Sequence, residues 1–244
     1  MFWLSNKVRR NVLVTTTQGY MLVNRFDQTG QTLLEIGHFG ESDIEFCHES
    51  LVARNQDALS VFDIGAGIGT FSSWVAHVFP RSHIYCFEPQ RAVCELLTAN
   101  AAINNFYNMH AYNTAVGDKD TTISYYEPDY FAPADFDTFS LTRPHELQCT
   151  ENSVKIQQQT IDSFVTLHNV NSMDFLKITT NGMEVEVLRG ANEALARFRP
   201  VIYMDYVPHG PNANRDDIVA ILESHNYGVK GTDTNKILAV YEQL

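Results

Sequence analysis

Strand-like and helix-like patterns of apolar residues alternate along most of this chain. From residue 60 onward, short apolar runs typical of buried strands are separated by longer stretches whose apolar positions repeat at helical spacing. The expected strands are residues 60–64, 83–87, 112–116, 175–179, 201–207, 227–231 and 237–241, and the expected helices are residues 70–79, 91–104, 183–198 and 215–224. This alternation predicts an α/β fold with a mostly parallel seven-stranded sheet and helices on both faces. The short spacing between the last two strands predicts an antiparallel pair at the C-terminal edge.

A different pattern precedes this alternation. Residues 12–16 and 20–24 are β-rich runs on either side of Gln18-Gly19, which predicts a hairpin, and residues 42–54 have apolar positions at helical spacing. We therefore expect residues 1–55 to form an N-terminal hairpin and helix that pack on a main domain of residues 56–244. The length of 244 residues suits one large domain.

Residues 127–152 interrupt the alternation with three prolines, several aromatic residues and many polar ones. A long segment without regular structure in a compact domain is usually functional or mobile. We expect either a loop on the substrate side of the domain or a plain surface excursion.

Composition excludes some classes of protein. Hydrophobic residues make up 44% of the chain and charged residues 19%, which is ordinary for a folded domain and not for a disordered one. The net charge of −12 argues against nucleic-acid phosphates or an anionic membrane surface as partners. No apolar run approaches the ~18–20 residues that span a bilayer, so we expect no stable membrane insertion. The four cysteines include no Cys-x-x-Cys pair, which indicates neither a zinc site nor a disulfide framework and favours a cytoplasmic location.

A glycine-rich turn carries the strongest chemical signal. Residues 61–70 read VFDIGAGIGT, so a buried strand runs into a turn with three glycines and a helix begins directly afterwards. Glycines allow a close approach of the backbone to a ligand, and a helix N-terminus offers free N–H groups. A dinucleotide site would have G-x-G-x-x-G, but here the third glycine is Gly69 and not residue 70. Asp63 would oppose a pyrophosphate and favour a cationic ligand, so the pattern favours S-adenosylmethionine over NAD.

A second carboxylate supports a nucleoside site. Glu88 follows the expected strand 83–87, nineteen residues after Gly69. An acid at the tip of the neighbouring strand can accept both ribose hydroxyls of an adenosine. This geometry suits NAD as well as S-adenosylmethionine, so Glu88 indicates the nucleoside and leaves the cofactor open.

Several ordered blocks of the chain resemble the FkbM family of S-adenosylmethionine-dependent methyltransferases, which has a Rossmann-like fold. The similar blocks are Asp63–Thr70 (family D-x-G-A-N-x-G), Phe87-Glu88-Pro89, Asn100 with Asn104-Asn105, Ala115-Val116-Gly117-Asp118, Ser140-Leu141, Thr160-Ile161-Asp162, Lys177-Ile178, residues 184–191, and residues 199–205. The resemblance implies that Asp63 and the turn of Gly65, Ala66, Gly67, Gly69 and Thr70 hold the methionine portion of the cofactor, that Glu88 holds the ribose, and that Ala115 and Val116 flank the adenine. It also implies methylation of hydroxyl groups, often on sugars, with Lys177 facing the acceptor.

The chain departs from the family at one block. Where the family has K-I-D-x-E-G, this sequence reads Lys177-Ile178-Thr179-Thr180-Asn181-Gly182, so both acids are absent. Glu184 remains one turn further on, and Asp205 remains across the sheet. The departure keeps a second hypothesis open, in which the chain binds S-adenosylmethionine without turnover.

A hydroxyl acceptor needs a general base, and four residues are candidates for that role. They are His209, His145, Glu184 and Asp205; a histidine with an ordinary pKa of about 6.5 suits proton transfer. Lys177 could orient the acceptor oxygen. The histidines show no metal-binding spacing, so we expect no metal. Our leading hypothesis is an S-adenosylmethionine-dependent O-methyltransferase that acts on a sugar, a glycan or a glycosylated metabolite, with an NAD-dependent oxidoreductase as a further alternative.

Overall fold

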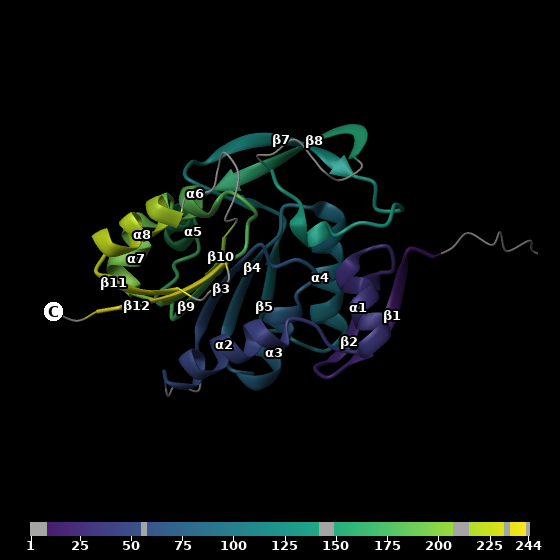
Figure 1. Cartoon of the computed structure of the whole chain (residues 1–244), viewed down its shortest axis with the longest axis horizontal. Coiled ribbons are helices and arrows are strands. Elements are labelled where there is room, and N and C mark those ends of the chain that lie inside the picture. Colours follow the sequence, from purple (N-terminus) through teal and green to yellow (C-terminus); the bar gives the residue numbers. More distant parts are fainter. Residues whose placement is uncertain (1–8, 55–57, 142–148, 207–214, 232–234, 243–244) are drawn as a thin grey trace, which may run out of the picture.

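The computed structural model describes residues 9–54, 58–141, 149–206, 215–231 and 235–242, and a seven-stranded sheet forms its centre (Figure 1). In chain order the strands of this sheet are β3 (Ser60–Ile64), β4 (His83–Phe87), β5 (Met109–Tyr112), β9 (Phe175–Ile178), β10 (Val201–Asp205), β11 (Tyr227–Gly231) and β12 (Lys236–Tyr241). Their spatial order is β11-β12-β10-β9-β3-β4-β5. Neighbouring strands from β10 to β5 are parallel, and β12 is antiparallel to both β10 and β11. The expected sheet and its antiparallel C-terminal pair are confirmed.

Helices cover both faces of this sheet. They are α2 (Glu41–Val52), α3 (Thr70–Val78), α4 (Arg91–Ile103), α5 (Ile161–Leu167), α6 (Glu184–Arg189), α7 (Asn192–Phe198) and α8 (Arg215–Ser224), whereas α1 (Gln28–Ile36) packs with the N-terminal hairpin. One apolar core contains buried side chains of α2, α3 and α4 together with Val61 of β3. The other contains buried side chains of α5 to α8 together with Phe62. Because adjacent strand residues point to opposite faces, Val61 and Phe62 each bury their side chain in a different core.

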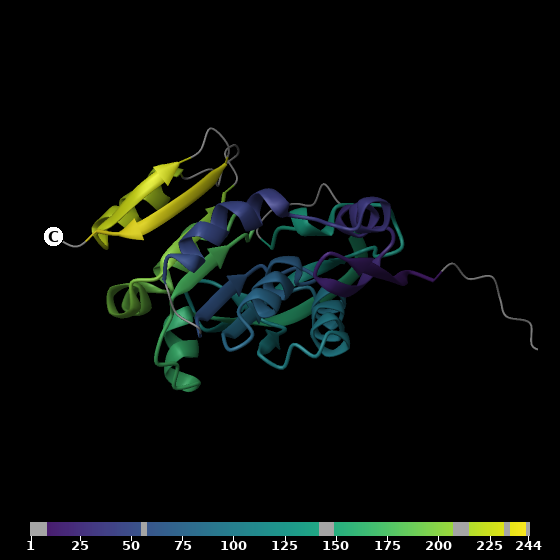
Figure 2. The same ribbon diagram turned by 90° about the horizontal axis from the view of Figure 1, so that it is seen from below.

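The N-terminal hairpin consists of β1 (Asn11–Thr16) and β2 (Gly19–Asn24), and it lies at the opposite end of the molecule from β11 and β12 (Figure 2). The buried Asn100 of α4 holds it in place. Its Oδ1 accepts a hydrogen bond from the Leu22 N–H at 2.6 Å, and its Nδ2 donates to the Ile68 carbonyl at 2.9 Å. The hairpin is therefore tied to the glycine turn through one side chain. The expected domain boundary between residues 55 and 56 lies outside the described residues and stays a prediction.

The expected strand over residues 112–116 is wrong in its bounds. β5 ends at Tyr112, and β6 (Ala115–Val116) joins β7 (Thr121–Pro128) and β8 (Cys149–Gln159) in a separate three-stranded sheet. Asn113 turns the chain between the two sheets, because its Nδ2 donates to the Glu88 carbonyl at 2.9 Å and to the Pro89 carbonyl at 3.0 Å. The irregular segment expected over residues 127–152 is also shorter than predicted, because β7 and β8 occupy both of its ends.

The single helix expected over residues 183–198 is two helices, α6 and α7. Asp162 supplies the reason, since its carboxylate oxygens accept hydrogen bonds from the N–H groups of Glu193 at 3.0 Å and Ala194 at 2.8 Å. These contacts cap the first turn of α7 and so start a new helix there. Helices α1 and α5 and strands β7 and β8 were not predicted. The apolar positions of α1, β7 and β8 are few, whereas α5 has Ile161, Phe164 and Val165 at helical spacing but is only seven residues long.

Candidate functional site

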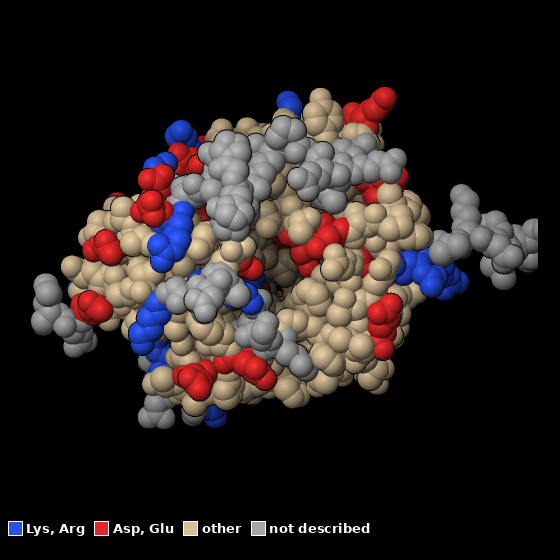
Figure 3. All heavy atoms as spheres, viewed as in Figure 1, with Lys and Arg blue, Asp and Glu red and all other residues tan. Residues whose placement is uncertain are grey.

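A cavity of about 410 Å³ opens at the carboxyl ends of β3, β4, β9 and β10. This is the edge where open α/β sheets bind their ligands, and the volume suits a small-molecule site. Figure 3 shows the hollow on this face of the molecule, with Asp and Glu side chains gathered beside it. The described residues that line it include Gly65, Ala66, Gly67, Thr70, Glu88, Ala115, Val116, Asp137, Lys177, Thr179, Asn181 and Asp205. Most residues predicted to hold a cofactor therefore lie on one cavity.

The glycine turn has a backbone that other residues would strain. Gly65, Gly67 and Gly69 have φ angles of +77°, +56° and +88°, in the left-handed region that favours glycine. A Cβ at Gly65 would lie 2.0 Å from the Thr179 carbonyl oxygen, which is closer than any real contact. The turn is thus packed against the end of β9, and α3 begins directly after it at Thr70.

Asp63 lies behind the cavity wall. The side chain is fully buried, and the residue does not belong to the lining. Its Oδ1 accepts a hydrogen bond from Lys177 Nζ at 2.8 Å, and its Oδ2 accepts one from Ser72 Oγ at 2.6 Å. The carboxylate charge is therefore balanced inside the protein by Lys177. A direct contact between Asp63 and a cofactor stays a prediction.

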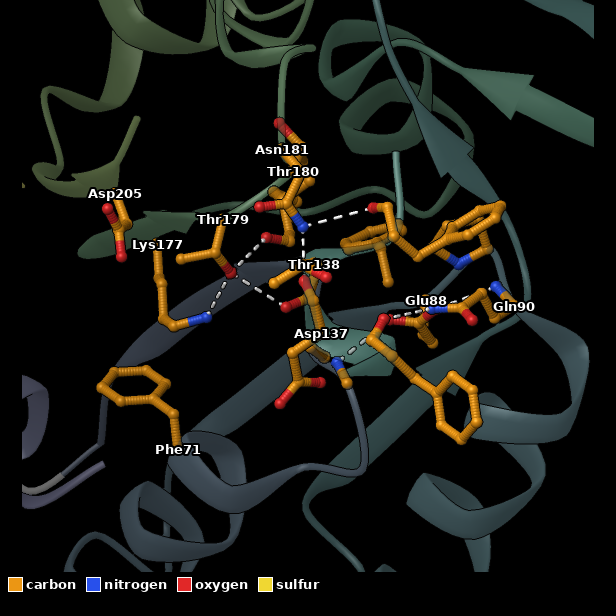
Figure 4. Close-up of a pocket in the computed structure, with 18 of the residues that line it drawn as sticks. Phe71, Glu88, Gln90, Asp137, Thr138, Lys177, Thr179, Thr180, Asn181 and Asp205 are labelled. Atoms are coloured by element: carbon orange, nitrogen blue, oxygen red, sulfur yellow. Dashed lines mark hydrogen bonds between the residues drawn. The ribbon is translucent and has the colours of Figure 1, made fainter. Parts of the chain in front are cut away.

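Lys177 is the cation of the cavity wall. Besides Asp63, its Nζ donates to Thr179 Oγ1 at 2.8 Å, and it lies 5.5 Å from the centre of the Phe71 ring (Figure 4). Thr179 Oγ1 in turn donates to the Gly65 carbonyl at 3.0 Å. A residue at one of the two family acid positions thus links the lysine to the glycine turn.

Glu88 spans the glycine turn and the start of α4. Its Oε2 accepts a hydrogen bond from the Gly67 N–H at 3.0 Å, and its Oε1 accepts one from the Gln90 N–H at 2.8 Å. The side chain is buried, and this desolvation raises its pKa to about 8. A carboxylate has about four acceptor positions, so two remain for donors such as ribose hydroxyls.

A short 3₁₀ turn at Phe136–Thr138 lines part of the cavity, and it belongs to the segment 127–152 that we expected to be either a substrate-side loop or a surface excursion. Asp137 of this turn lines the cavity, and Thr29 Oγ1 of α1 donates a hydrogen bond to its Oδ2. Desolvation by the surrounding protein atoms raises the pKa of Asp137, although the residue keeps contact with solvent at the cavity. The nearby Ser140-Leu141 pair was the available signal for this segment, and it does not point to Asp137.

Asn181 holds this turn against the end of β9. Its Nδ2 donates to the Asp137 carbonyl and, at 3.2 Å, to the Phe139 carbonyl. Asn181 has a φ angle of +54°, a conformation that asparagine tolerates better than most residues. The second of the two family acid positions is therefore used here to fasten the 3₁₀ turn.

The candidate general bases have different surroundings. Glu184 is buried away from the cavity lining, and its carboxylate accepts hydrogen bonds from the Gly182 N–H at 2.8 and 3.1 Å and from Thr180 Oγ1 at 3.2 Å. Asp205 lines the cavity at the end of β10. His209 and His145 lie outside the described residues. Asp205 is thus the one of these candidates that the described part of the structure brings to the cavity.

Within the described ranges, no group of three or more His, Cys, Asp and Glu side chains is arranged to hold a metal ion. Over those same ranges, no helix combines the length and the apolar character that crossing a bilayer requires.

Comparisons with known proteins agree with this architecture. The model of the methyltransferase FkbM domain matches residues 63–229, more than half of the chain. "Methyltransferase 1" of Beauveria bassiana (strain ARSEF 2860) is 21% identical over 193 residues, which cover 70% of this chain and 77% of that protein. The crystal structure of methyltransferase FkbM from Methylobacillus flagellatus KT superposes with a TM-score of 0.52 at 16% identity, over 76% of this chain and 44% of that one. The structure of monomeric WbdD has a TM-score of 0.50 at 11% identity, over 86% of this chain and 43% of that one.

This chain therefore spans less than half the length of these two structures, and their likeness bears on the fold alone. The family match covers the glycine turn, Glu88 and Lys177. It confirms the expected methyltransferase and the resemblance seen in the sequence blocks. The chain belongs to the FkbM family of methyltransferases.

Proposed function

We propose that this chain transfers a methyl group from S-adenosylmethionine to a hydroxyl of a sugar, a glycan or a glycosylated metabolite. One observation carries the proposal: a single cavity joins the glycine turn and Glu88 to Lys177 and Asp205. The first pair suits an adenosine-bearing donor, and the second pair suits an acceptor that must lose a proton. A cytoplasmic location and an acceptor other than nucleic acid are parts of the same proposal, supported by the cysteine pattern and the net charge of −12.

The residues present fit the donor. Glu88 has acceptor positions for the ribose hydroxyls, and Ala115 and Val116 offer small apolar side chains for the adenine. The glycine turn and the N-terminus of α3 would receive the methionine portion, because free N–H groups there favour its carboxylate. NAD fits less well, since the acids around this turn would repel its pyrophosphate.

The donor supplies an electrophilic methyl group on a cationic sulfur. The acceptor oxygen forms the new C–O bond while the C–S bond breaks, so the protein has to position the acceptor and take its proton. We assign proton removal to Asp205, which lies at the mouth of the cavity. Lys177 lies on the same side of the cavity (Figure 4) and would orient the acceptor oxygen. The aromatic side chains of Phe136 and Phe139 in the wall would exclude water from the reacting atoms.

One observation favours a second candidate, a protein that binds S-adenosylmethionine without turnover. Thr179 and Asn181 replace the two family acids, and both side chains are engaged in contacts within the protein. If those acids are needed for catalysis, Asp205 would have to take over their role.

Calorimetry with S-adenosylmethionine and with NAD tests the donor, and release of S-adenosylhomocysteine across nucleotide sugars, glycosides and a short RNA tests the acceptor. We expect S-adenosylmethionine to bind and a sugar hydroxyl to be methylated, and Asp205→Asn to remove turnover while donor binding persists. Binding without turnover on any acceptor would favour the second candidate. A preference for NAD, or methylation of RNA alone, would overturn the proposal.

A further inference from the structure

The buried ion pair leaves open which group balances the positive charge of the donor. Asp63 is the acid nearest the glycine turn in sequence, but its carboxylate is occupied by Lys177 Nζ at 2.8 Å and by Ser72 Oγ. The pair is neutral as a whole. The acids among the described residues of the cavity lining are Glu88, Asp137 and Asp205, and these have to supply any negative charge that the donor meets.

Two of these acids lie against the glycine turn: Glu88 accepts a hydrogen bond from the Gly67 N–H, and Asp137 lies over the open side of Gly67, where a side chain would be. A Cβ at Gly67 would lie 2.9 Å from Asp137 Oδ1, so this oxygen sits directly over the backbone of the turn. Thr29 Oγ1 donates to the other oxygen, Oδ2, which fixes the orientation of the carboxylate. Figure 4 shows Asp137 between Lys177 on one side and Glu88 on the other.

Asn181 accounts for the placement of Asp137. Its amide N–H groups donate to the carbonyls of Asp137 and Phe139, and these bonds fasten the 3₁₀ turn over the cavity. A carboxylate at position 181 has no N–H to donate and would repel both carbonyls. The asparagine at this family acid position thus holds the turn that carries another acid, Asp137, at the cavity.

We propose that Asp137 binds the cationic methionine end of the methyl donor, and that Asn181 is the residue that positions it. This inference rests on the proposed function. The methionine end carries a sulfonium and an ammonium group beside its carboxylate and is therefore cationic overall, whereas adenosine is neutral. A carboxylate over the glycine turn therefore distinguishes the donor from its adenosine portion by charge. Hydrogen bonds between charged groups are the stronger ones in proteins, and the low polarity of a cavity strengthens them further.

The test compares S-adenosylmethionine with 5′-methylthioadenosine, which has the adenosine and the thioether but neither charge. We expect Asp137→Asn to weaken S-adenosylmethionine binding about tenfold to a hundredfold, the range of a lost charged hydrogen bond. The affinity for 5′-methylthioadenosine should change less than about twofold, because this ligand has no charged group for the Asp137 carboxylate to contact. The matched control is Glu95→Gln, which removes an acid from the exposed surface pair with Arg91 and should alter neither affinity.

The outcomes separate this inference from the proposed function. Failure of the unaltered protein to bind S-adenosylmethionine would refute the function itself. Normal donor binding by Asp137→Asn, or an equal loss for both ligands, would refute the role of Asp137 alone. S-adenosylhomocysteine identifies the group: its binding weakens if Asp137 contacts the ammonium and persists if the contact is with the sulfonium.

A second variant keeps the test decisive if Asp137→Asn does not fold. Asn181→Gly leaves the Asp137 carboxylate in the chain, removes the donors that fasten its turn, adopts the φ angle of +54° without strain and adds no charge to the cavity. We expect it to lower the affinity for S-adenosylmethionine severalfold and to leave 5′-methylthioadenosine binding unchanged. Donor binding equal to that of the unaltered protein would overturn the proposal.

Discussion

Replacing Lys177 by methionine should destabilise the protein strongly. Asp63 is fully buried, and the Lys177 side chain is only 9% exposed, so almost no water reaches either charge of this 2.8 Å pair. Methionine keeps a flexible apolar stem beside Phe71 but leaves the Asp63 carboxylate with Ser72 as its remaining described side-chain partner. The change therefore isolates the loss of the positive charge from the loss of packing.

The burial of the pair determines how much stability the protein should lose. Breaking a buried ion pair by removing one partner costs about 3–5 kcal/mol, because an uncompensated charge stays in the interior. For a domain of 150–250 residues each kcal/mol lowers the midpoint of thermal unfolding by about 2–4 °C, so we expect a decrease of roughly 6–20 °C. The double variant Asp63→Asn with Lys177→Met should recover much of this loss, since it removes the stranded charge as well.

The assays are urea unfolding for the free energy and thermal unfolding for the midpoint, both followed by circular dichroism at pH 7 without ligand. Lys119→Met is the matched control, because Lys119 and Asp118 form a pair at 3.5 Å whose lysine is 76% exposed. An exposed pair of this kind contributes at most about 1 kcal/mol. The reasoning fails if Lys177→Met costs no more than Lys119→Met, or if the double variant is less stable than Lys177→Met alone.

Three further predictions follow from single contacts. Gly65→Ala would place a Cβ 2.0 Å from the Thr179 carbonyl at a φ of +77°, so we expect loss of donor binding by calorimetry; binding at the original affinity would show that the turn tolerates a side chain. Burial raises the pKa of Glu88 from 4.5 to about 8, so its protonated form is favoured by folding, and the stability it contributes is present at low pH and lost as the pH rises through about 8. Glu88→Gln should therefore flatten the fall of the thermal midpoint between about pH 5 and 8, and an unchanged slope would contradict the shift. Asn100→Ala removes the hydrogen bonds to the Leu22 N–H and to the Leu22 and Ile68 carbonyls and should cost about 1–3 kcal/mol in urea unfolding, with faster amide exchange in β2 as the local sign; full protection of β2 would speak against this role.

Local patterns account for what could be predicted of the fold. The run from β3 through the glycine turn into α3 is contiguous, so apolar periodicity and glycine spacing describe it completely. The position of Glu88 at the tip of β4 follows for the same reason, because parallel neighbours end at the same edge of a sheet. Elements with weak periodicity, such as β7 and β8, gave no comparable signal.

The break between α6 and α7 shows why local patterns are insufficient. Residues 183–198 have helical periodicity throughout, but the cap that starts α7 comes from Asp162, on a helix some thirty positions earlier in the chain. Gly190 at the end of α6 is the one local mark of the break, but the side chain that caps α7 is a spatial neighbour from another element and leaves no mark nearby in the sequence. The same holds for Asn113, whose contacts with the carbonyls after β4 end the strand early.

The sequence by itself determined the alternation of strands and helices, the antiparallel pair at the C-terminal edge, and the glycine turn that follows β3, since these depend on residues near one another in the chain. The tertiary structure alone decided which acids face the ligand cavity. Asp63 directly precedes the glycine turn in the sequence. Its carboxylate, however, forms a buried ion pair with Lys177, which lies 114 positions away in the chain. Asp137 has no motif of its own and reaches the glycine turn because Asn181 and Thr29 hold its segment there. A carboxylate acts through the groups within a few ångströms of it, and only folding brings those groups together.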